Sequence, residues 1–417
     1  MIIADLHIHS KYSRACSPQL TLANIAKWSL IKGINLVSTG DFTHPAWFQE
    51  IKANLSEDKT GLLFLKNSDQ KVKFILGTEV SAIYSQGGKT RRVHLCLFFP
   101  TIVGVEKFNA ELQGRGKNLK SDGRPILGMS AKEILKIMKE IDGRSVMIPA
   151  HAWTPWFSVF GSKSGFDSLE ECFEELTSEI FAIETGLSSD PAMNWRLSQL
   201  DEIALVSNSD AHSLPNLGRE ANVFNLDINK ITYNELFQTI KEKNPLKFLK
   251  TIEFYPEEGM YHLDGHRACG VTLTPKQSLK NKNLCPVCKK PLTIGVLNRV
   301  EELADREEKI IPPQAIPFVS LVELDKIIAE ALGVKSRTSK AVQAEFEKII
   351  KEGGSELNIL MNLTYVELKK ITLPEIVEGI RRMREKELTI EPGFDGQYGR
   401  VTIFSPKEKQ ARQKKLF

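Results

Sequence analysis

The chain lacks three features that would place it in a specialised class of protein. No apolar run among its 417 residues is long enough to span a membrane, so we expect no membrane partner. Six cysteines in a chain of this length do not suggest a disulfide scaffold. The first residues lack the basic, apolar and small-residue segments of a secretory signal, and we therefore expect a cytoplasmic protein.

Composition and charge describe a globular protein with two unlike parts. Hydrophobic residues make up 41% and charged residues 26% of the chain, which is ordinary for a globular fold, and the length predicts two or three domains. The net charge of +4 is uneven, because residues 261–417 carry 27 Lys/Arg against 21 Asp/Glu whereas the first 260 residues carry 29 against 31. This distribution fits a metal site followed by a part that binds a polyanion; a solvated surface is the alternative interpretation.

Strand and helix patterns alternate over the first 240 residues. Buried strands are predicted at residues 2–7, 34–39, 73–80, 91–99, 145–148, 181–183 and 203–207, with helices at 22–32 and 130–141 among them. Such alternation predicts a parallel sheet, and the number of units predicts an α/β barrel. From residue 320 the patterns are helical, at 321–332, 340–351, 364–371 and 374–386, before a short strand at 401–404 and a basic tail at 407–415. We therefore divide the chain into residues 1–240, 241–315 and 316–417.

Residues able to bind a metal come near the ends of the predicted strands. In the stretch Asp5-Leu6-His7-Ile8-His9, alternate side chains share a face of the strand, so His7 and His9 point the same way. The other members of the set are Asp41, Glu79, His94, His151, Asp210 and His212. Active sites of α/β barrels lie at the carboxyl ends of the strands, so we expect these residues to meet there. Taken singly, His94 has an alternative as a core histidine and Asp41 as a helix cap.

This set suits metal-dependent hydrolysis of a phosphate ester. Imidazole ligands suit zinc, manganese or iron, and a carboxylate such as Glu79 can hold two cations close together. Such a pair can bind a phosphate and make hydroxide available near neutral pH. No serine or cysteine nucleophile stands out in the sequence. We expect Zn²⁺ at this site, with Mg²⁺ or Mn²⁺ as alternatives.

A second group of candidate ligands lies in the middle of the chain. His266 and Cys269 are followed by Cys285 and Cys288, and paired short spacings separated by a hairpin-sized loop are typical of structural zinc. Four protein ligands close the coordination sphere, so the predicted Zn²⁺ stabilises the fold and takes no part in catalysis. His262 is the alternative to His266 as the fourth ligand.

The strand-end motifs resemble a known superfamily. Asp5-Leu6-His7-Ile8-His9-Ser10, Gly77-Thr78-Glu79, His151 and Asn208-Ser209-Asp210-Ala211-His212 are similar to the motifs of PHP (polymerase and histidinol phosphatase) proteins. The resemblance implies a distorted (βα)7 barrel with a phosphoesterase site for two or three metals. It implies that His7, His9, Glu79 and Asp210 surround the first metal, that Glu79, His94 and His151 hold the second, and that His212 belongs to the third.

The sequence departs from the PHP pattern at the third metal. Many members have an acidic residue shortly after His-x-His, where this chain has Arg14. Many have Thr-Asp-His after the second strand, where this chain has Gly40-Asp41-Phe42. Either Asp41 or His44 substitutes as a ligand there, or Arg14 supplies a positive charge that meets a phosphate directly.

Three further features narrow the resemblance to the endonuclease Q family, over essentially the whole chain. They are Gly40-Asp41-Phe42-Thr43-His44-Pro45, the cluster of His266 and three cysteines, and Gly393-Phe394-Asp395-Gly396. This resemblance implies a DNA repair enzyme that nicks on the 5′ side of deaminated bases (uracil, hypoxanthine, xanthine) and abasic sites, leaving 3′-hydroxyl and 5′-phosphate ends. Damaged DNA is then the partner and the prokaryotic nucleoid the setting. A replication or repair clamp is a further candidate partner, and a monomer is expected.

Several side chains are candidates for contact with such a substrate. An enzyme that inspects a base takes it out of the stack, and Trp153 and Trp156 follow a metal-bearing strand end, where they would stack on a base or fill its place. Packing on the barrel rim is the alternative for both. The remaining candidates are Arg14, His44, Glu184 and Arg219. Support of a metal ligand is the alternative for Glu184, and a solvated charge is the alternative for Arg219.

Two other functions fit part of the sequence. A phosphatase acting on a small phosphomonoester would explain the metal-binding residues of the barrel, but not the zinc cluster or the basic second half. A non-catalytic nucleic-acid-binding protein with a structural barrel would explain the second half, but it would tolerate missing ligands, and the set here is nearly complete.

Overall fold

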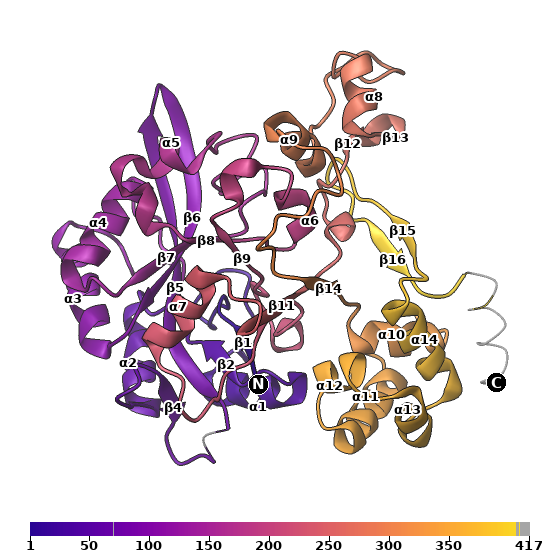
Figure 1. Ribbon diagram of the computed structural model, residues 1–417, viewed down its shortest axis with the longest axis horizontal. Helices are drawn as coiled ribbons and strands as arrows, with labels where there is room; N and C mark the ends of the chain where they lie inside the picture. The colour runs from indigo at the N-terminus through magenta and orange to yellow at the C-terminus, as the bar shows by residue number, and fades with distance from the viewer. Residues whose placement is uncertain (70, 406–407, 409–417) are drawn as a thin grey trace.

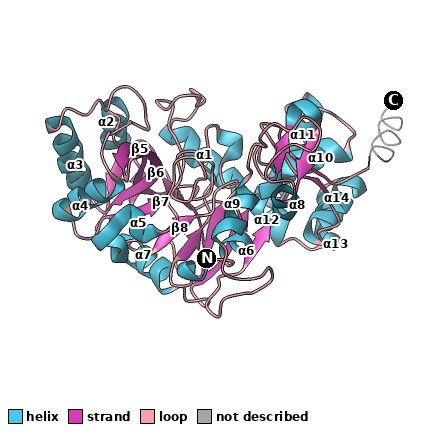
Figure 2. Ribbon diagram, turned by 90° about the horizontal axis from the view of Figure 1, so that it is seen from above, coloured by secondary structure: helices cyan, strands magenta, loops and turns pink. Residues whose placement is uncertain are grey.

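A computed structural model describes residues 1–69, 71–405 and 408 of the protein. Figure 1 shows a mixed α/β part at one side and a group of helices at the other, and the view from above in Figure 2 separates the same two parts. The group of helices comprises α10 (Leu324–Ala331), α11 (Lys340–Gly353), α12 (Glu356–Met361), α13 (Tyr365–Ile371) and α14 (Pro374–Arg384). The basic tail predicted at 407–415 lies outside the described residues except for Glu408.

The strands of the α/β part follow one another around the candidate metal-binding residues. In spatial order they are β1 (Ile2–Asp5), β2 (Leu36–Ser38), β5 (Lys73–Gln86), β6 (Lys89–Phe99), β7 (Val146–Pro149), β8 (Ala182–Glu184) and β9 (Ala204–Val206). β8 and β9 form a separate parallel pair. A backbone bond from Ala152 to Glu184 joins that pair to the chain after β7, and a parallel bridge between Ile8 and Ala211 joins it to the chain after β1. Segments far apart in sequence therefore converge on one site.

The sheet is mixed, which corrects the parallel sheet expected from strand–helix alternation. β1, β2 and β5 are parallel, but β6 runs antiparallel to both β5 and β7. β5 and β6 form one long hairpin that turns at Gly87 and Gly88, whose φ values are +59° and +72°. Two adjacent residues with positive φ make the two-residue turn that suits hairpin strands, and glycine adopts it without strain. The Gly-Gly pair is a hairpin signal present in the sequence.

Helices cover the outside of this sheet. They are α1 (Leu22–Lys32), α2 (Pro45–Asn54), α3 (Ile102–Gly114), α4 (Ala131–Ile141), α5 (Leu169–Phe173), α6 (Pro191–Asn194) and α7 (Tyr233–Glu242). The predicted helix 22–32 is observed with the same limits, and Ser130 caps α4 by accepting from Glu133 N at 3.1 Å. Glu133 itself pairs with Arg115. Helices α2, α3, α5, α6 and α7 lie outside the predicted ranges.

Further strands extend the sheet beyond the strands that surround the site. They are β3 (Leu55–Glu57) and β4 (Leu63–Leu65) beside β5, with β10 (Ala221–Phe224), β11 (Phe248–Glu253) and β14 (Phe318–Ser320) beside β1. The buried faces of these strands and of the covering helices form two apolar clusters. The candidate metal-binding residues are thus carried by a packed scaffold, as a precise site requires.

The middle of the chain forms a small element between the two larger parts. It contains β12 (Asp264–His266), β13 (Val271–Leu273), α8 (Pro275–Lys280) and α9 (Val296–Leu303). A hairpin of β15 (Thr389–Glu391) and β16 (Arg400–Thr402) lies against it, and the Asp395 carboxylate of that hairpin accepts bonds from Arg267 N and Thr293 Oγ1. Among the helices that the structure describes, none combines the length and the apolar character that a membrane span needs. The three-part division of the chain remains a prediction.

Candidate metal centre

Four side chains from separate elements form the first group of candidate ligands. His7 and His9 follow β1, Glu79 lies within β5, and Asp210 follows β9. His9 Nε2 lies 3.1 Å from Asp210 Oδ1 and 3.2 Å from Glu79 Oε2, and His7 Nε2 lies 3.6 Å and 3.5 Å from the same two oxygens. Zinc bonds of about 2.1 Å in a tetrahedron separate the ligand atoms by about 3.4 Å. The group therefore has the spacing of a tetrahedral metal site.

The hydrogen bonding of this group also fits a cation. Among the described residues, three of its buried atoms have no hydrogen-bond partner, namely His7 Nε2, His9 Nε2 and Asp210 Oδ1. Buried polar atoms without partners are rare because each costs free energy. All three face the same small space, as their mutual distances show. A divalent cation at that point would satisfy all three at once.

A second group shares Glu79 with the first. His94 Nδ1 lies 2.7 Å and His151 Nε2 lies 3.1 Å from Glu79 Oε1, while Oε2 faces the first group. Glu79 is fully buried, so its charge needs compensation close by. One carboxylate with an oxygen in each group is the arrangement that bridges two cations. His94 reaches the site from the antiparallel strand β6, and so from within a strand instead of from a carboxyl end.

Negative charge dominates the surroundings of these imidazoles. Burial alone lowers the pKa of His9, but Asp41, Asp210 and Glu79 together raise it well above its usual value. The pKa of His7 is likewise raised against the effect of burial, by Cys96 first and then by Glu184 and Glu79. Burial lowers the pKa of His94 to about 4 in spite of Glu79, so this imidazole is neutral and able to bind a metal. A site that attracts protons to this extent equally attracts cations.

Two buried carboxylates orient His7 and His9 through the ring nitrogens that point away from the ligand group. Asp41 Oδ1 lies 3.0 Å from His9 Nδ1, and Glu184 Oε2 lies 3.0 Å from His7 Nδ1. Such carboxylate–histidine contacts fix the ring orientation of metal ligands. Glu184 also accepts from His151 N at 2.7 Å. Asp41, predicted as a ligand with a helix cap as the alternative, contacts His9 through Nδ1, whereas His9 Nε2 faces the ligand group. Glu184 lies where its alternative role, support of a metal ligand, requires it to be.

The backbone is strained at three residues of the site. Asp41, His151 and Asp210 have φ values of +46°, +30° and +46°, a region that residues other than glycine rarely adopt. Gly186 makes room for His151, since a Cβ at Gly186 would lie 2.5 Å from His151 Cβ. Strain of this kind gathers at functional sites, where packing holds a side chain in a required place.

None of the other residues considered for a third metal forms a group with these ligands. His212 lies beside His9, with ring centroids 4.6 Å apart, and its Nδ1 lies 2.8 Å from Asp210 O. His44 caps α2 and stacks on Tyr12. Arg14 is 79% exposed and pairs with Asp122. In the part of the chain that the structure describes, His212, His44 and Arg14 belong to none of the groups of candidate ligands. A further group there, His7, Cys96 and Glu184, shares His7 with the first.

The structure adds one arginine that sequence analysis missed. Arg124 Nη1 lies 3.0 Å from Glu79 Oε2, and its side chain is 26% exposed. Glu79 contributes most to raising the pKa of Arg124, which therefore stays charged. Arg124 belongs to no motif and lies in a loop, so only the fold brings it to the site.

The candidate substrate contacts have different environments. Trp153 is fully buried and donates its Nε1 hydrogen to Asn194, so it packs inside the fold and cannot stack on a base. Trp156 is 38% exposed and meets Tyr261 edge-on, with ring centroids 5.6 Å apart. Arg219 donates from Nε to Ser209 O at 2.9 Å, next to the ligand Asp210. Of the two tryptophans, Trp156 is the one accessible to a ligand.

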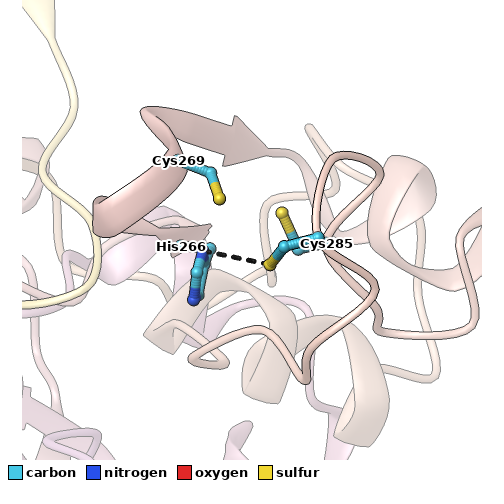
Figure 3. A group of neighbouring side chains, drawn as sticks. His266, Cys269 and Cys285 are labelled. Carbon is cyan, nitrogen blue, oxygen red and sulfur yellow. Dashed lines mark hydrogen bonds between the residues drawn. The ribbon is translucent and has the colours of Figure 1, made fainter.

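The second predicted cluster also assembles. His266 ends β12, and Cys269, Cys285 and Cys288 lie with it inside one group whose ligand atoms are within 4.8 Å of one another. Figure 3 shows His266, Cys269 and Cys285 turned toward a common centre, and His266 Nδ1 lies 3.7 Å from Cys288 Sγ. His262 is outside this group, and burial lowers its pKa to about 4. The four protein ligands fit a closed, tetrahedral site.

A family model and a curated relative each match part of the chain. A family model described as the MJ0043 C-terminal domain matches residues 323–387. An uncharacterised protein of Methanocaldococcus jannaschii, MJ0043, is 36% identical over 265 residues, which are 62% of this chain. The match covers 32% of that relative, so the chain aligns with about a third of its length.

Two solved structures match the whole chain. The lesion-specific endonuclease PfuEndoQ of Pyrococcus furiosus is 32% identical, with a TM-score of 0.84 over 98% of both chains. A structure of Endonuclease Q in complex with a 27-mer duplex substrate, with an abasic lesion at the active site, is 33% identical, with a TM-score of 0.84 over 100% of both chains. The likeness extends through the α/β part, the small central element and the C-terminal helices alike.

Proposed function

The chain belongs to the endonuclease Q family, and on this premise we propose that it is a DNA repair endonuclease that hydrolyses the phosphodiester beside a damaged nucleotide. The observation that carries the proposal is the pair of ligand groups bridged by Glu79, in a chain that matches a lesion-bound Endonuclease Q from end to end. We further propose a nick on the 5′ side of the lesion, with 3′-hydroxyl and 5′-phosphate ends. Abasic sites, uracil, hypoxanthine and xanthine are the proposed lesions.

The residues of the site have two roles in this reaction, as metal ligands and as supports of those ligands. His7, His9, Glu79 and Asp210 would hold one cation, and Glu79, His94 and His151 would hold a second. Cations bound there would polarise the phosphodiester and make hydroxide available near neutral pH. Glu184 and Asp41 keep His7 and His9 in position before the substrate arrives, so little reorganisation is needed during the reaction. We propose the strands around the site as the distorted (βα)7 barrel of PHP proteins.

A nicking assay with matched substrates tests the proposal. End-labelled duplexes that differ only at one position, undamaged, abasic, uracil, hypoxanthine or xanthine, are incubated with Zn²⁺, Mn²⁺, Mg²⁺ or EDTA. We expect metal-dependent nicking of the damaged duplexes, and extension of the product by a polymerase would identify the 3′-hydroxyl. Release of phosphate from a small phosphomonoester without nicking would select a phosphatase instead. Binding of damaged DNA without cleavage would select a non-catalytic protein.

Variants of the ligands connect the reaction to the site. His9→Ala removes a nitrogen ligand of the first group, and Asp210→Asn removes the negative charge of an oxygen ligand, so nicking should be lost while most of the DNA affinity stays. Asp142→Asn is the matched control, because Asp142 lies just before β7 and pairs with Arg144 at the opposite end of that strand from His151. Full activity in either ligand variant would refute the assignment.

The metals and partners complete the proposal. Zn²⁺ in the closed cluster of His266 and the three cysteines, and Zn²⁺, Mn²⁺ or Mg²⁺ in the bridged site, are the proposed cofactors. Anomalous scattering at the metal absorption edges would identify each ion. We propose that the protein is a monomer that acts on chromosomal DNA in the cytoplasm, with a replication or repair clamp as a second partner. Light scattering would test the oligomeric state, and co-purification would test binding to the clamp.

A further inference from the structure

The segment of residues 122–127, here called the strap, crosses the candidate metal centre from the side of His9 to strand β5. At its start Gly123 N donates to Tyr12 O at 3.0 Å. At its end Ser81 N donates to Pro125 O at 3.0 Å, and Leu127 N donates to Ser81 O at 2.9 Å. The strap is thus tied both to the loop after β1 and to the strand that carries Glu79.

The strap lies in close contact with the residues that support His9. A Cβ added at Gly123 would lie 2.2 Å from Ser13 Oγ and 2.4 Å from Asp41 Oδ2. Only glycine lets the backbone approach so closely. Thr43 Oγ1 donates to Gly123 O, which anchors the same point from the other side. The residue after Gly123 is therefore held in place by packing, and that residue is Arg124.

Arg124 is placed to offer positive charge at the metal centre. Among the lysines and arginines that the structure describes, it is the one that forms an ion pair with a member of the two ligand groups. Nη1 contacts Glu79 Oε2, while Nε and Nη2 have no acceptor within the described residues. A guanidinium has five N–H donors in a planar fork, so most of its capacity remains unused. The side chain is also partly exposed, so a ligand can reach it.

We propose that Arg124 binds a non-bridging oxygen of the phosphate group on which the enzyme acts. It thereby takes the role that the sequence offered to Arg14, whose side chain is 79% exposed and paired with Asp122. The fork geometry of a guanidinium matches two phosphate oxygens, and its charge balances the negative charge that develops during hydrolysis. The inference rests on the proposed function, because it requires a phosphate ester in this site.

A measurement of phosphate affinity distinguishes phosphate binding by Arg124 from a role in which Arg124 only holds Glu79 in place. The full-length protein loaded with Mn²⁺ is titrated with inorganic phosphate by calorimetry, and bound metal is counted by mass spectrometry. For Arg124→Ala we expect phosphate binding weaker by about tenfold or more, with unchanged metal content. Arg124→Lys, which keeps the charge without the fork, should lie between wild type and alanine. Arg144→Ala, a change of an exposed arginine before β7, should behave as wild type.

Single-turnover nicking of the abasic duplex gives the second readout. We expect Arg124→Ala to slow nicking about a hundredfold, and added guanidinium ion to restore part of the rate. Wild-type phosphate affinity in Arg124→Ala, or a loss of bound metal in step with lost nicking, would overturn the proposal. So would a larger loss of phosphate affinity in Arg14→Ala. Phosphate binding through Arg124 without nicking of damaged DNA would refute only the choice of DNA as substrate, because the role of Arg124 requires a phosphate ester of any kind in this site.

Discussion

Asp41 offers a sharp test of how the site is built, because sequence and structure assign it different roles. As a metal ligand it would lose its function on conversion to asparagine. In the structure it is instead a fully buried support whose Oδ1 lies 3.0 Å from His9 Nδ1. Its Oδ2 accepts from Ser10 N at 2.6 Å, Ser10 Oγ at 2.7 Å and Ser13 Oγ at 2.9 Å.

The expected magnitude follows from these contacts. In Asp41→Asn the side-chain NH₂ group takes the place of one carboxylate oxygen. It then faces either His9 Nδ1 or the N–H of Ser10, and a backbone N–H cannot rotate to avoid a second donor. One charge-assisted bond is lost in either case. Loss of such a support weakens metal binding about 10- to 100-fold, which corresponds to about 1.4–2.7 kcal/mol. The direct ligands remain, so the site should still fill at higher metal concentration.

The assay measures nicking of an abasic duplex as a function of free Mn²⁺. We expect the midpoint for Asp41→Asn to rise about 10- to 100-fold, with a maximum rate within a few-fold of wild type. Asp210→Asn should stay inactive at every metal concentration, because Asp210 Oδ1 belongs to the ligand group itself. An Asp41→Asn enzyme that no metal concentration rescues would show that Asp41 is a ligand and that the structural assignment is wrong.

Three further predictions concern stability. Cys285→Ser should lower both the zinc content and the melting temperature, because it removes a ligand of a closed site; an unchanged melting curve would contradict structural zinc. Glu356→Ala should lower the free energy of unfolding in urea by about 3–5 kcal/mol, because it leaves the buried ammonium of Lys32 without its partner 2.6 Å away. The double variant Lys32→Met/Glu356→Leu should recover most of that free energy; if it does not, the ion pair itself stabilises the protein. Burial raises the pKa of Glu253 to about 8, above its value in the unfolded chain, so its contribution to stability falls as pH rises from about 4.5 to 8. Between pH 6 and 8 that loss is about 2 kcal/mol, and a Glu253→Gln variant with the same pH dependence as wild type would refute it.

The candidate ligands could be listed from the sequence because their signals are local. The His-x-His spacing after β1 puts two imidazoles on one face whatever the rest of the fold does. Helix α1 was predictable in the same way, from its periodicity and from Gly33, which ends it with φ of +94°. The spacing of His266, Cys269, Cys285 and Cys288 likewise carries its geometry within a short segment.

The direction of β6 was open to the same local reasoning but was predicted incorrectly. Strand–helix alternation predicts parallel strands, yet no helix separates β5 from β6. The Gly87-Gly88 pair between them is a hairpin signal, and its positive φ values turn the chain back at once. His94 therefore enters the site from a strand of opposite direction, although its identity as a candidate ligand came from the sequence.

The amino-acid sequence by itself determined the residue types of the candidate metal centre and of the cluster of His266 and three cysteines, since strand alternation and short ligand spacing act over a few residues. Only the tertiary structure decided which carboxylates lie behind the histidines and which arginine faces Glu79. Asp41, Glu184 and Arg124 are brought to His9, His7 and Glu79 by loops whose path depends on packing between distant segments. Arg14 and Arg124 are both arginines, so the sequence does not distinguish their roles. The close passage of the strap at Gly123 places Arg124, and not Arg14, in the site.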